Sequence, residues 1–215
     1  YNEAMNIKWY GQACFCIESP SGNIITDPYS PKIGWELPKL SAKVLTISHS
    51  HYDHNYREAV TAGKIIDSTG TFEVGDISIT GIEANHDEEC GKKLGKVIVF
   101  KIEAEGISIL HLSDLGTELN QAQKDIIGKV DIVLIPAGGI YTVSPEKAAS
   151  IALELNPKII VPMHYKLSGI SETTLYSITR FVSAINLSPI YKKELDNPTS
   201  LFTDPPQLVI LEKAS

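Results

Sequence analysis

Apolar residues fall into short runs along the first half of the chain. The runs at 13–18, 23–26 and 44–48 are separated by polar turn residues, and each has the length of a β-strand. Two later segments, 72–82 and 96–112, each hold a pair of apolar runs around a glycine-containing turn, which is typical of a β-hairpin. The first half of the chain is therefore predicted to be rich in β-strands.

The spacing of apolar positions changes in the second half. Continuous apolar runs at 130–135 and 159–163 are typical of strands buried on both faces, and 208–211 forms a closing strand. Apolar residues at helical spacing predict helices over 145–155, which begins with a serine N-cap and a proline, and over 175–185. The pattern predicts an α+β protein in which two packed sheets are covered by helices.

Composition and charge exclude several classes of protein. The 215 residues carry a formal net charge of −7, which argues against binding to a nucleic-acid backbone. No apolar run approaches the ~20 residues of a membrane span. The three cysteines form no CxxC pair, so a reducing cytoplasm suits the chain. No linker divides the sequence, so we expect one domain over 1–215, with Met5 a candidate natural start; the oligomeric state is left open.

A dense group of histidines and one aspartate follows the apolar run at 44–48. Residues 48–54 read Ser-His-Ser-His-Tyr-Asp-His, and the candidate ligands are His49, His51, Asp53 and His54. Neutral imidazole and carboxylate groups are good ligands for zinc and related divalent ions. A turn entering a short helix would direct these side chains toward one point, so the cluster predicts a metal site. A solvated polar loop is the alternative.

The H-x-H-x-D-H pattern after an apolar strand resembles the signature of the metallo-β-lactamase superfamily. That resemblance implies a four-layer αββα sandwich with a dinuclear metal centre. It also implies further site residues in a set order, each after an apolar strand, and this sequence supplies Asp27, His86, Asp114 and His164. The resemblance covers residues 5–211.

Carried over by position, the resemblance implies two sets of ligands: His49, His51 and His86 on one metal, and Asp53, His54 and His164 on the other, with Asp114 bridging the two. Zinc is the expected ion, and the nitrogen and oxygen ligands also suit manganese or iron. Asp27 would orient the ligand loops through hydrogen bonds. Considered singly, His86 has the alternative of a surface histidine and Asp114 that of a helix N-cap.

Three stretches indicate which branch of the superfamily the chain resembles. Residues 5–13, 136–148 and 162–165 are similar to the compact cytoplasmic hydrolases grouped with ascorbate-6-phosphate lactonase and the phospholipase D that cleaves N-acylphosphatidylethanolamine. The short interval between Asp114 and His164 leaves no room for the inserted domain of the nucleic-acid-processing branch.

Two residues near the implied ligands depart from the pattern of that group, and one further histidine has no counterpart among the implied ligands. Gln12 occupies a position where histidine is common, and Ser113 one where glycine is common. Because neither is an implied ligand, both bear on the substrate more than on metal binding. His111 has no assigned role; we expect a buried, hydrogen-bonded core histidine, with a contact to a ligand as the alternative.

The implied chemistry is hydrolysis. Two divalent ions can share a hydroxide that attacks a carbonyl or phosphorus centre, with Asp53 holding the hydroxide in line. The two ions carry more positive charge than Asp53, Asp114 and a hydroxide carry negative charge, so we expect a small anionic ester, lactone or phosphodiester as substrate. The alternative is a metal-bearing domain that binds or senses a small anion without turnover.

Four residues are candidates for the substrate pocket: Gly138, Gly139, Tyr141 and Tyr165. Backbone amides of the glycine loop could bind an oxyanion. The alternatives are that Gly138 and Gly139 only form a tight turn and that Tyr165 only packs. Trp9 and Trp35 are expected to pack in the core or at the surface, with a place at the pocket rim as the alternative for Trp35.

Overall fold

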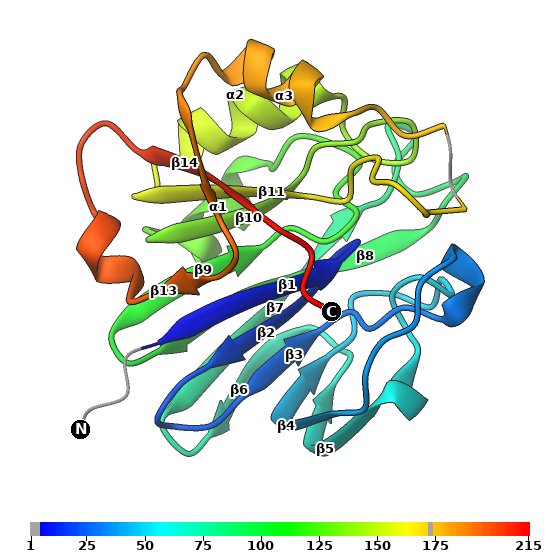
Figure 1. Ribbon diagram of the computed structural model, residues 1–215, viewed down its shortest axis with the longest axis vertical. Helices are drawn as coiled ribbons and strands as arrows, with labels where there is room; N and C mark the ends of the chain where they lie inside the picture. The colour runs from blue at the N-terminus through cyan, green and yellow to red at the C-terminus, as the bar shows by residue number, and fades with distance from the viewer. Residues whose placement is uncertain (1–4, 172–173) are drawn as a thin grey trace.

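Two mixed β-sheets, packed face to face, dominate the residues that the computed structural model describes, 5–171 and 174–215 (Figure 1). Residues 1–4, which precede the candidate start, lie outside this range. The smaller sheet has the strand order β13-β1-β2-β3-β4-β5. Its strands are β1 (Asn6–Gly11), β2 (Cys14–Glu18), β3 (Ile24–Thr26), β4 (Leu40–Thr46), β5 (Val60–Ile66) and β13 (Leu195–Asp196).

The larger sheet has the strand order β12-β14-β11-β10-β9-β8-β7-β6. Both predicted hairpins belong to it, since β6 pairs with β7 and β8 with β9, each pair antiparallel. β9, β10 and β11 run parallel to one another. The strands are β6 (Gly70–Val74), β7 (Ile77–Asn85), β8 (Lys96–Ala104), β9 (Ile107–His111), β10 (Ile132–Pro136), β11 (Ile159–Met163), β12 (Pro189–Lys192) and β14 (Gln207–Leu211).

The α-helices lie against the outer face of the larger sheet; they are α1 (Gln121–Ile127), α2 (Pro145–Leu155) and α3 (Ile178–Ile185). α2 begins as predicted, because the Ser144 hydroxyl accepts the backbone N–H of Lys147 and Pro145 occupies the first turn. Short 3₁₀ turns are η1 (Pro31–Ile33), η2 (Arg57–Ala59) and η3 (Pro198–Leu201). No helix in the described part of the chain is long and apolar enough to cross a membrane.

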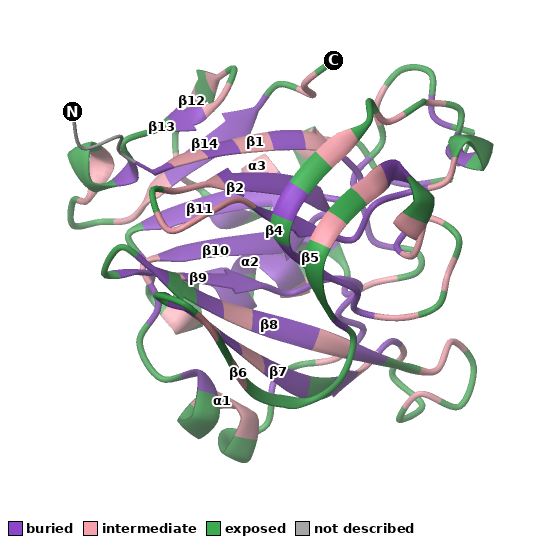
Figure 2. Cartoon of the chain, turned by 90° about the horizontal axis from the view of Figure 1, so that it is seen from below, coloured by how far each residue is buried: buried purple, intermediate pink, exposed green. Residues whose placement is uncertain are grey.

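The main apolar core fills the space between the two sheets. Trp9 and Phe15 from the smaller sheet pack in one cluster with Phe100 and Ile102 from the larger sheet. β10 and β11 are buried at every position, as their continuous apolar runs predict (Figure 2). Full burial of each large apolar side chain stabilises the fold by about 1.5–3 kcal/mol. The shared core therefore fixes how the two sheets face one another.

A loop covers the outer face of the smaller sheet. Tyr29, Ile33 and Trp35 pack there in a second cluster with Cys14 and Cys16 of β2. The predicted α+β sandwich is confirmed, but among the described residues this outer layer is a loop and a 3₁₀ turn instead of an α-helix. Prolines at 28, 31 and 38 explain the difference, because proline cannot continue a helix interior.

Candidate metal centre

The predicted site residues meet at one edge of the sandwich, where several strands end. β3 and β4 run parallel in the smaller sheet, and β9 and β11 lie parallel to β10 in the larger one. The carboxyl ends of parallel strands meet at the same edge of a sheet. Asp27, the 48–54 segment, Asp114 and His164 each follow one of these strands, and His86 follows β7. The strand order therefore brings distant parts of the chain to one place.

The first group of candidate ligands consists of His49, His51 and His86. Nδ1 of His51 lies 3.0 Å from Nε2 of His49 and 3.2 Å from Nε2 of His86. The three nitrogens therefore point toward one another within a span of 4.8 Å. Histidine nitrogens at such spacing can surround one ion.

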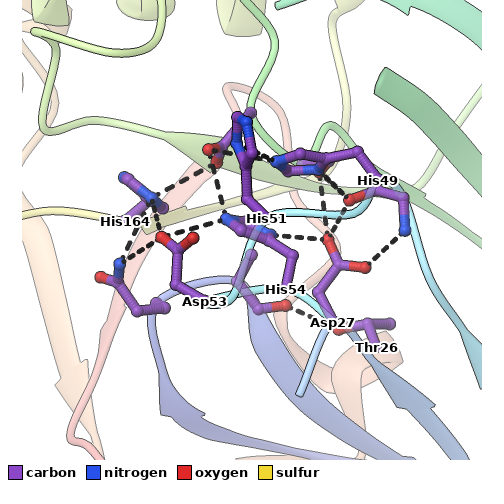
Figure 3. Close-up of polar contacts among 12 residues, drawn as sticks. Thr26, Asp27, His49, His51, Asp53, His54 and His164 are labelled. Carbon is purple, nitrogen blue, oxygen red and sulfur yellow. Dashed lines mark hydrogen bonds and ion pairs between the residues drawn. The ribbon is translucent and has the colours of Figure 1, made fainter. Parts of the chain in front are cut away.

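The second group consists of Asp53, His54, Asp114 and His164. Oδ2 of Asp53 lies 3.5 Å from Nε2 of His54 and 3.6 Å from Nε2 of His164 (Figure 3). One nitrogen or oxygen of each residue falls within 4.8 Å of the others. Three of these residues are buried, whereas the Asp53 side chain is 17% exposed and reaches toward solvent.

Asp114 lies between the two groups. Its Oδ2 is 3.4 Å from Nε2 of His86 and 3.9 Å from Nε2 of His49, both in the first group. The same oxygen is 3.2 Å from Nε2 of His54, and Oδ1 is 3.4 Å from Nε2 of His164, both in the second group. The carboxylate therefore occupies the central position that the resemblance assigns to a bridging ligand.

Asp27 holds the ligand-bearing loops from behind. Its Oδ1 accepts the backbone N–H of Ser48 at 2.8 Å, and its Oδ2 accepts the Ser48 hydroxyl at 2.6 Å (Figure 3). Nδ1 of His54 lies 3.0 Å from Oδ2. Because a carboxylate only accepts, Nδ1 of His54 carries a proton and Nε2 is the nitrogen that can bind a metal.

Serine hydroxyls extend this buried network. Oγ of Ser48 gives its hydrogen to Asp27, so it accepts at 2.9 Å from Nδ1 of His49, which leaves Nε2 of His49 facing the site. Ser113 donates from its hydroxyl to Oδ2 of Asp27 at 3.0 Å and lies 2.5 Å from Oγ of Ser48. No sequence pattern indicated a role for Ser48, and Ser113 stood out only as a departure from glycine.

Charge and burial set the protonation of the site. Burial works against the ionised forms of Asp53 and Asp114, but the neighbouring histidines outweigh it and hold the pKa of both carboxyls below its ordinary value. Burial lowers the pKa of His49 to about 3 and also lowers that of His86. These two histidines are therefore neutral at neutral pH and have a lone pair for a metal.

Two other histidines carry the compensating charge. Burial opposes the charged form of His54, but Asp114, Asp53 and Asp27 outweigh burial and hold its pKa well above the ordinary value. The pKa of His164 is also raised, because Asp114 and Asp53 outweigh its burial. Divalent ions would replace these protons as the counter-charge of the carboxylates.

The donor set fits divalent metal ions. Nε2 of His54 and Oδ1 of Asp114 are buried without a hydrogen-bond partner among the described residues, although both face the centre of the cluster. Buried polar atoms of this kind are costly unless a partner or an ion satisfies them. Imidazole nitrogens with carboxylate oxygens suit zinc, manganese and iron.

A cavity of about 290 Å³ opens beside the two groups. Its lining comprises Gln12, Ile33, His51, Tyr52, Asp53, His86, Leu94, Asp114, Tyr141 and His164. The lining combines candidate ligands with aromatic and aliphatic side chains. Of the four predicted pocket residues, Tyr141 belongs to this lining.

The other predicted pocket residues lie elsewhere. Tyr165 is buried and packs against Trp9, with ring centroids 5.1 Å apart, so it is a core residue and not a pocket wall. A Cβ on Gly138 would lie 2.2 Å from the carbonyl oxygen of His164, so this glycine permits close approach of two loops. Gly139 adopts a φ of 63°, which supports the tight-turn alternative.

The structure also tests the expectations for His111, for the segment after the histidine cluster and for Trp35. His111 is confirmed as a buried core histidine, because its Nε2 lies 2.8 Å from the carbonyl oxygen of Ala13. The predicted turn is present at 51–54, and the short helix that it enters is the 3₁₀ turn Arg57–Ala59 and not an α-helix. Trp35 packs edge-on against Tyr29 outside the cavity lining.

Comparison with known proteins identifies the class. A family profile described as a beta-lactamase superfamily domain matches residues 6–164. The chain belongs to the metallo-β-lactamase superfamily, as its H-x-H-x-D-H pattern indicated.

Relatives and solved structures extend this result. A UPF0173 protein of Pyrococcus furiosus is 30% identical over 186 residues, which cover 75% of this chain and 83% of that protein. A UPF0173 metal-dependent hydrolase of Anaeromyxobacter dehalogenans is 29% identical over 206 residues, covering 74% of each chain. A proposed Zn-dependent hydrolase of the superfamily from Thermotoga maritima superposes with a TM-score of 0.78 at 36% identity, covering 97% of this chain and 98% of that one.

Proposed function

We propose that the protein is a metal-dependent hydrolase that uses two divalent ions, zinc being the expected metal. The observation that carries this proposal is the central carboxylate of Asp114, which lies within 3.9 Å of histidines from both ligand groups. A single-ion site has no need of such a shared carboxylate. The names of the relatives from Anaeromyxobacter and Thermotoga support the same class of activity.

Bound divalent ions would lower the pKa of a water molecule and polarise the oxygen of a scissile bond. The residues of this chain have their own parts. His49, His51 and His86 would hold one ion, and His54 and His164 the other. Asp53, the least buried member of its group, lines the cavity, where its carboxylate could orient water or take a proton.

The lining of the cavity suits a small substrate that has a negative group and an apolar part. Among the described residues that line it, none is lysine or arginine, so bound divalent ions would supply the counter-charge for a negative group. Ile33, Tyr52, Leu94 and Tyr141 offer an apolar contact to the remainder of the molecule. A small ester, lactone or phosphodiester with an anionic or strongly polar scissile group and a compact apolar part fits these walls.

Metal analysis and Asp53→Ala test the proposal. We expect about two ions per chain, and turnover of at least one member of a panel of aryl esters, lactones and a bis-aryl phosphodiester. Asp53→Ala should lower that turnover by about 10²–10⁴-fold while the melting temperature changes little. Asp125→Ala, an exposed aspartate on α1, is the matched control and should keep full activity. Binding of no more than one ion, or full turnover by Asp53→Ala, would contradict the proposal.

A further inference from the structure

Gln12 makes side-chain contacts that join the two sheets at the metal centre. It lies in the turn between β1 and β2 and is only 2% exposed. Its Nε2 donates to Oδ2 of Asp53 at 3.2 Å and lies 3.4 Å from Nε2 of His164. Asp53 follows a strand of the smaller sheet and His164 follows one of the larger sheet. One amide therefore touches a candidate ligand from each sheet.

The orientation of this amide follows from chemistry. The oxygens of the Asp53 carboxylate accept hydrogen bonds, and Oδ2 lies 3.2 Å from Nε2 of Gln12. The nitrogen of the amide must face Asp53, which turns Oε1 away. That oxygen is buried without a hydrogen-bond partner among the described residues.

The backbone holds the side chain in place. The carbonyl oxygen of Gln12 accepts the indole N–H of Trp9 at 2.9 Å and the backbone N–H of His164 at 3.2 Å. Its φ of 47° is a left-handed conformation that residues other than glycine rarely adopt. Both this conformation and the unsatisfied Oε1 oppose folding, so stability alone does not account for a glutamine here.

We propose that Gln12 is a positioning residue that holds the Asp53 carboxylate beside His164 and thereby sets the affinity of the second ligand group for its ion. The inference rests on the proposed function, since it requires a metal at that group. An amide suits the role because it does not titrate, so its N–H donors remain available to Asp53 at every pH. The buried, unsatisfied Oε1 of Gln12 lowers stability, and the same side chain restrains the Asp53 carboxylate.

Gln12→Met separates positioning from a structural role, because it keeps the length of the side chain and removes both polar atoms. For the metal-free protein we expect a melting temperature equal to or above that of the unchanged chain, since the unsatisfied oxygen is gone. In a titration of metal-free protein with Co²⁺, followed by its visible absorption, we expect one of two binding steps to weaken by about 10–100-fold and the other to stay unchanged. Gln12→His, which restores an N–H donor, should recover part of the loss.

Gln123→Met is the matched control. Its amide donates to the carbonyl oxygen of Glu83 at 2.7 Å and caps α1, away from the site. This variant should melt at a lower temperature and bind Co²⁺ in two unchanged steps. Gln12→Met with unchanged binding, or with both steps weakened together with a lower melting temperature, would overturn the inference. If the unchanged protein itself lacks two binding steps, the proposed function fails, and this inference fails with it.

Discussion

Four residues of the site have left-handed backbone conformations although none is glycine. They are Gln12, Asp27, Ser113 and His164, with φ between 37° and 50°. Such conformations cost about 1–3 kcal/mol each and persist only where the surrounding structure holds them. Each of these residues lies in a turn at a strand end, and the abrupt change of direction brings its side chain into the cluster. These backbone angles lower the stability of the fold, but they direct the side chains into the site.

The substitution Asp27→Asn tests the buried hydrogen-bond network around Asp27. The amide of asparagine has only one acceptor oxygen, so it cannot hold Ser48 and His54 as the carboxylate does. We expect Zn²⁺ affinity to fall by about 10–100-fold. Competition with a chromogenic chelator would measure the change.

Asp131→Asn is its control. Oδ2 of Asp131 accepts the backbone N–H and hydroxyl of Ser108, both at 2.8 Å, in a similar aspartate–serine pair that does not touch the site. This variant should alter the melting temperature alone. Equal losses of Zn²⁺ affinity in the two variants would show that Asp27 acts only through general stability.

The loops that follow the strands position the candidate ligands. The loop after β10 packs closely on the segment after β11. A Cβ on Gly138 would clash with the carbonyl oxygen of His164 and the Cα of Tyr165. We expect Gly138→Ala to displace His164 and to lower both the melting temperature and the content of bound metal. Metal analysis of the folded fraction measures the second effect.

Gly106→Ala provides the comparison for this prediction. Gly106 has a φ of 74° but no atom within 4 Å of an added Cβ, so alanine there is strained without a clash. It should lower the melting temperature and leave the metal content unchanged. A full metal content in Gly138→Ala would contradict the positioning of His164 by this loop.

The loop between β7 and β8 forms one wall of the cavity through Leu94. The carboxylate of Asp87 accepts backbone N–H groups of Glu89, Gly91, Lys93 and Leu94 at 2.8–3.0 Å. Asp87→Ala should therefore loosen this wall. We expect faster amide hydrogen exchange across 88–95 and a several-fold rise in KM with a smaller change in kcat. Unchanged exchange in this segment would contradict the assigned role.

The charge balance of the whole site predicts how metal binding depends on pH. Neighbouring carboxylates raise the pKa of His54 and of His164, so in the metal-free protein both keep their protons to a higher pH than an ordinary histidine does. A metal must displace these protons before it binds the same nitrogens. Zn²⁺ affinity should therefore fall as the pH is lowered, and binding should release at least about one proton. Calorimetry in two buffers of different ionisation enthalpy measures that release; binding that is independent of pH and buffer would contradict it.

Buried elements were predicted better than edge elements. The apolar runs of β10 and β11 report burial on both faces and give their positions closely. β5 lies at the edge of its sheet and is largely exposed, so its residues show no apolar pattern. α1 is short and mostly exposed, and the sequence pattern did not predict it. Hydrophobic patterning reports burial, and elements with little burial leave little trace in it.

The sequence alone determined the kind of site and its order along the chain, because ligand types and the strands before them are local features. The H-x-H-x-D-H cluster could be found in this way, and the resemblance to the superfamily then implied His86, Asp114 and His164. Only the tertiary structure decided that Gln12 contacts Asp53, that Ser113 contacts Asp27 and that Tyr165 faces the core. Those outcomes depend on left-handed backbone angles and on packing between two sheets. Neither leaves a pattern in the spacing of residues.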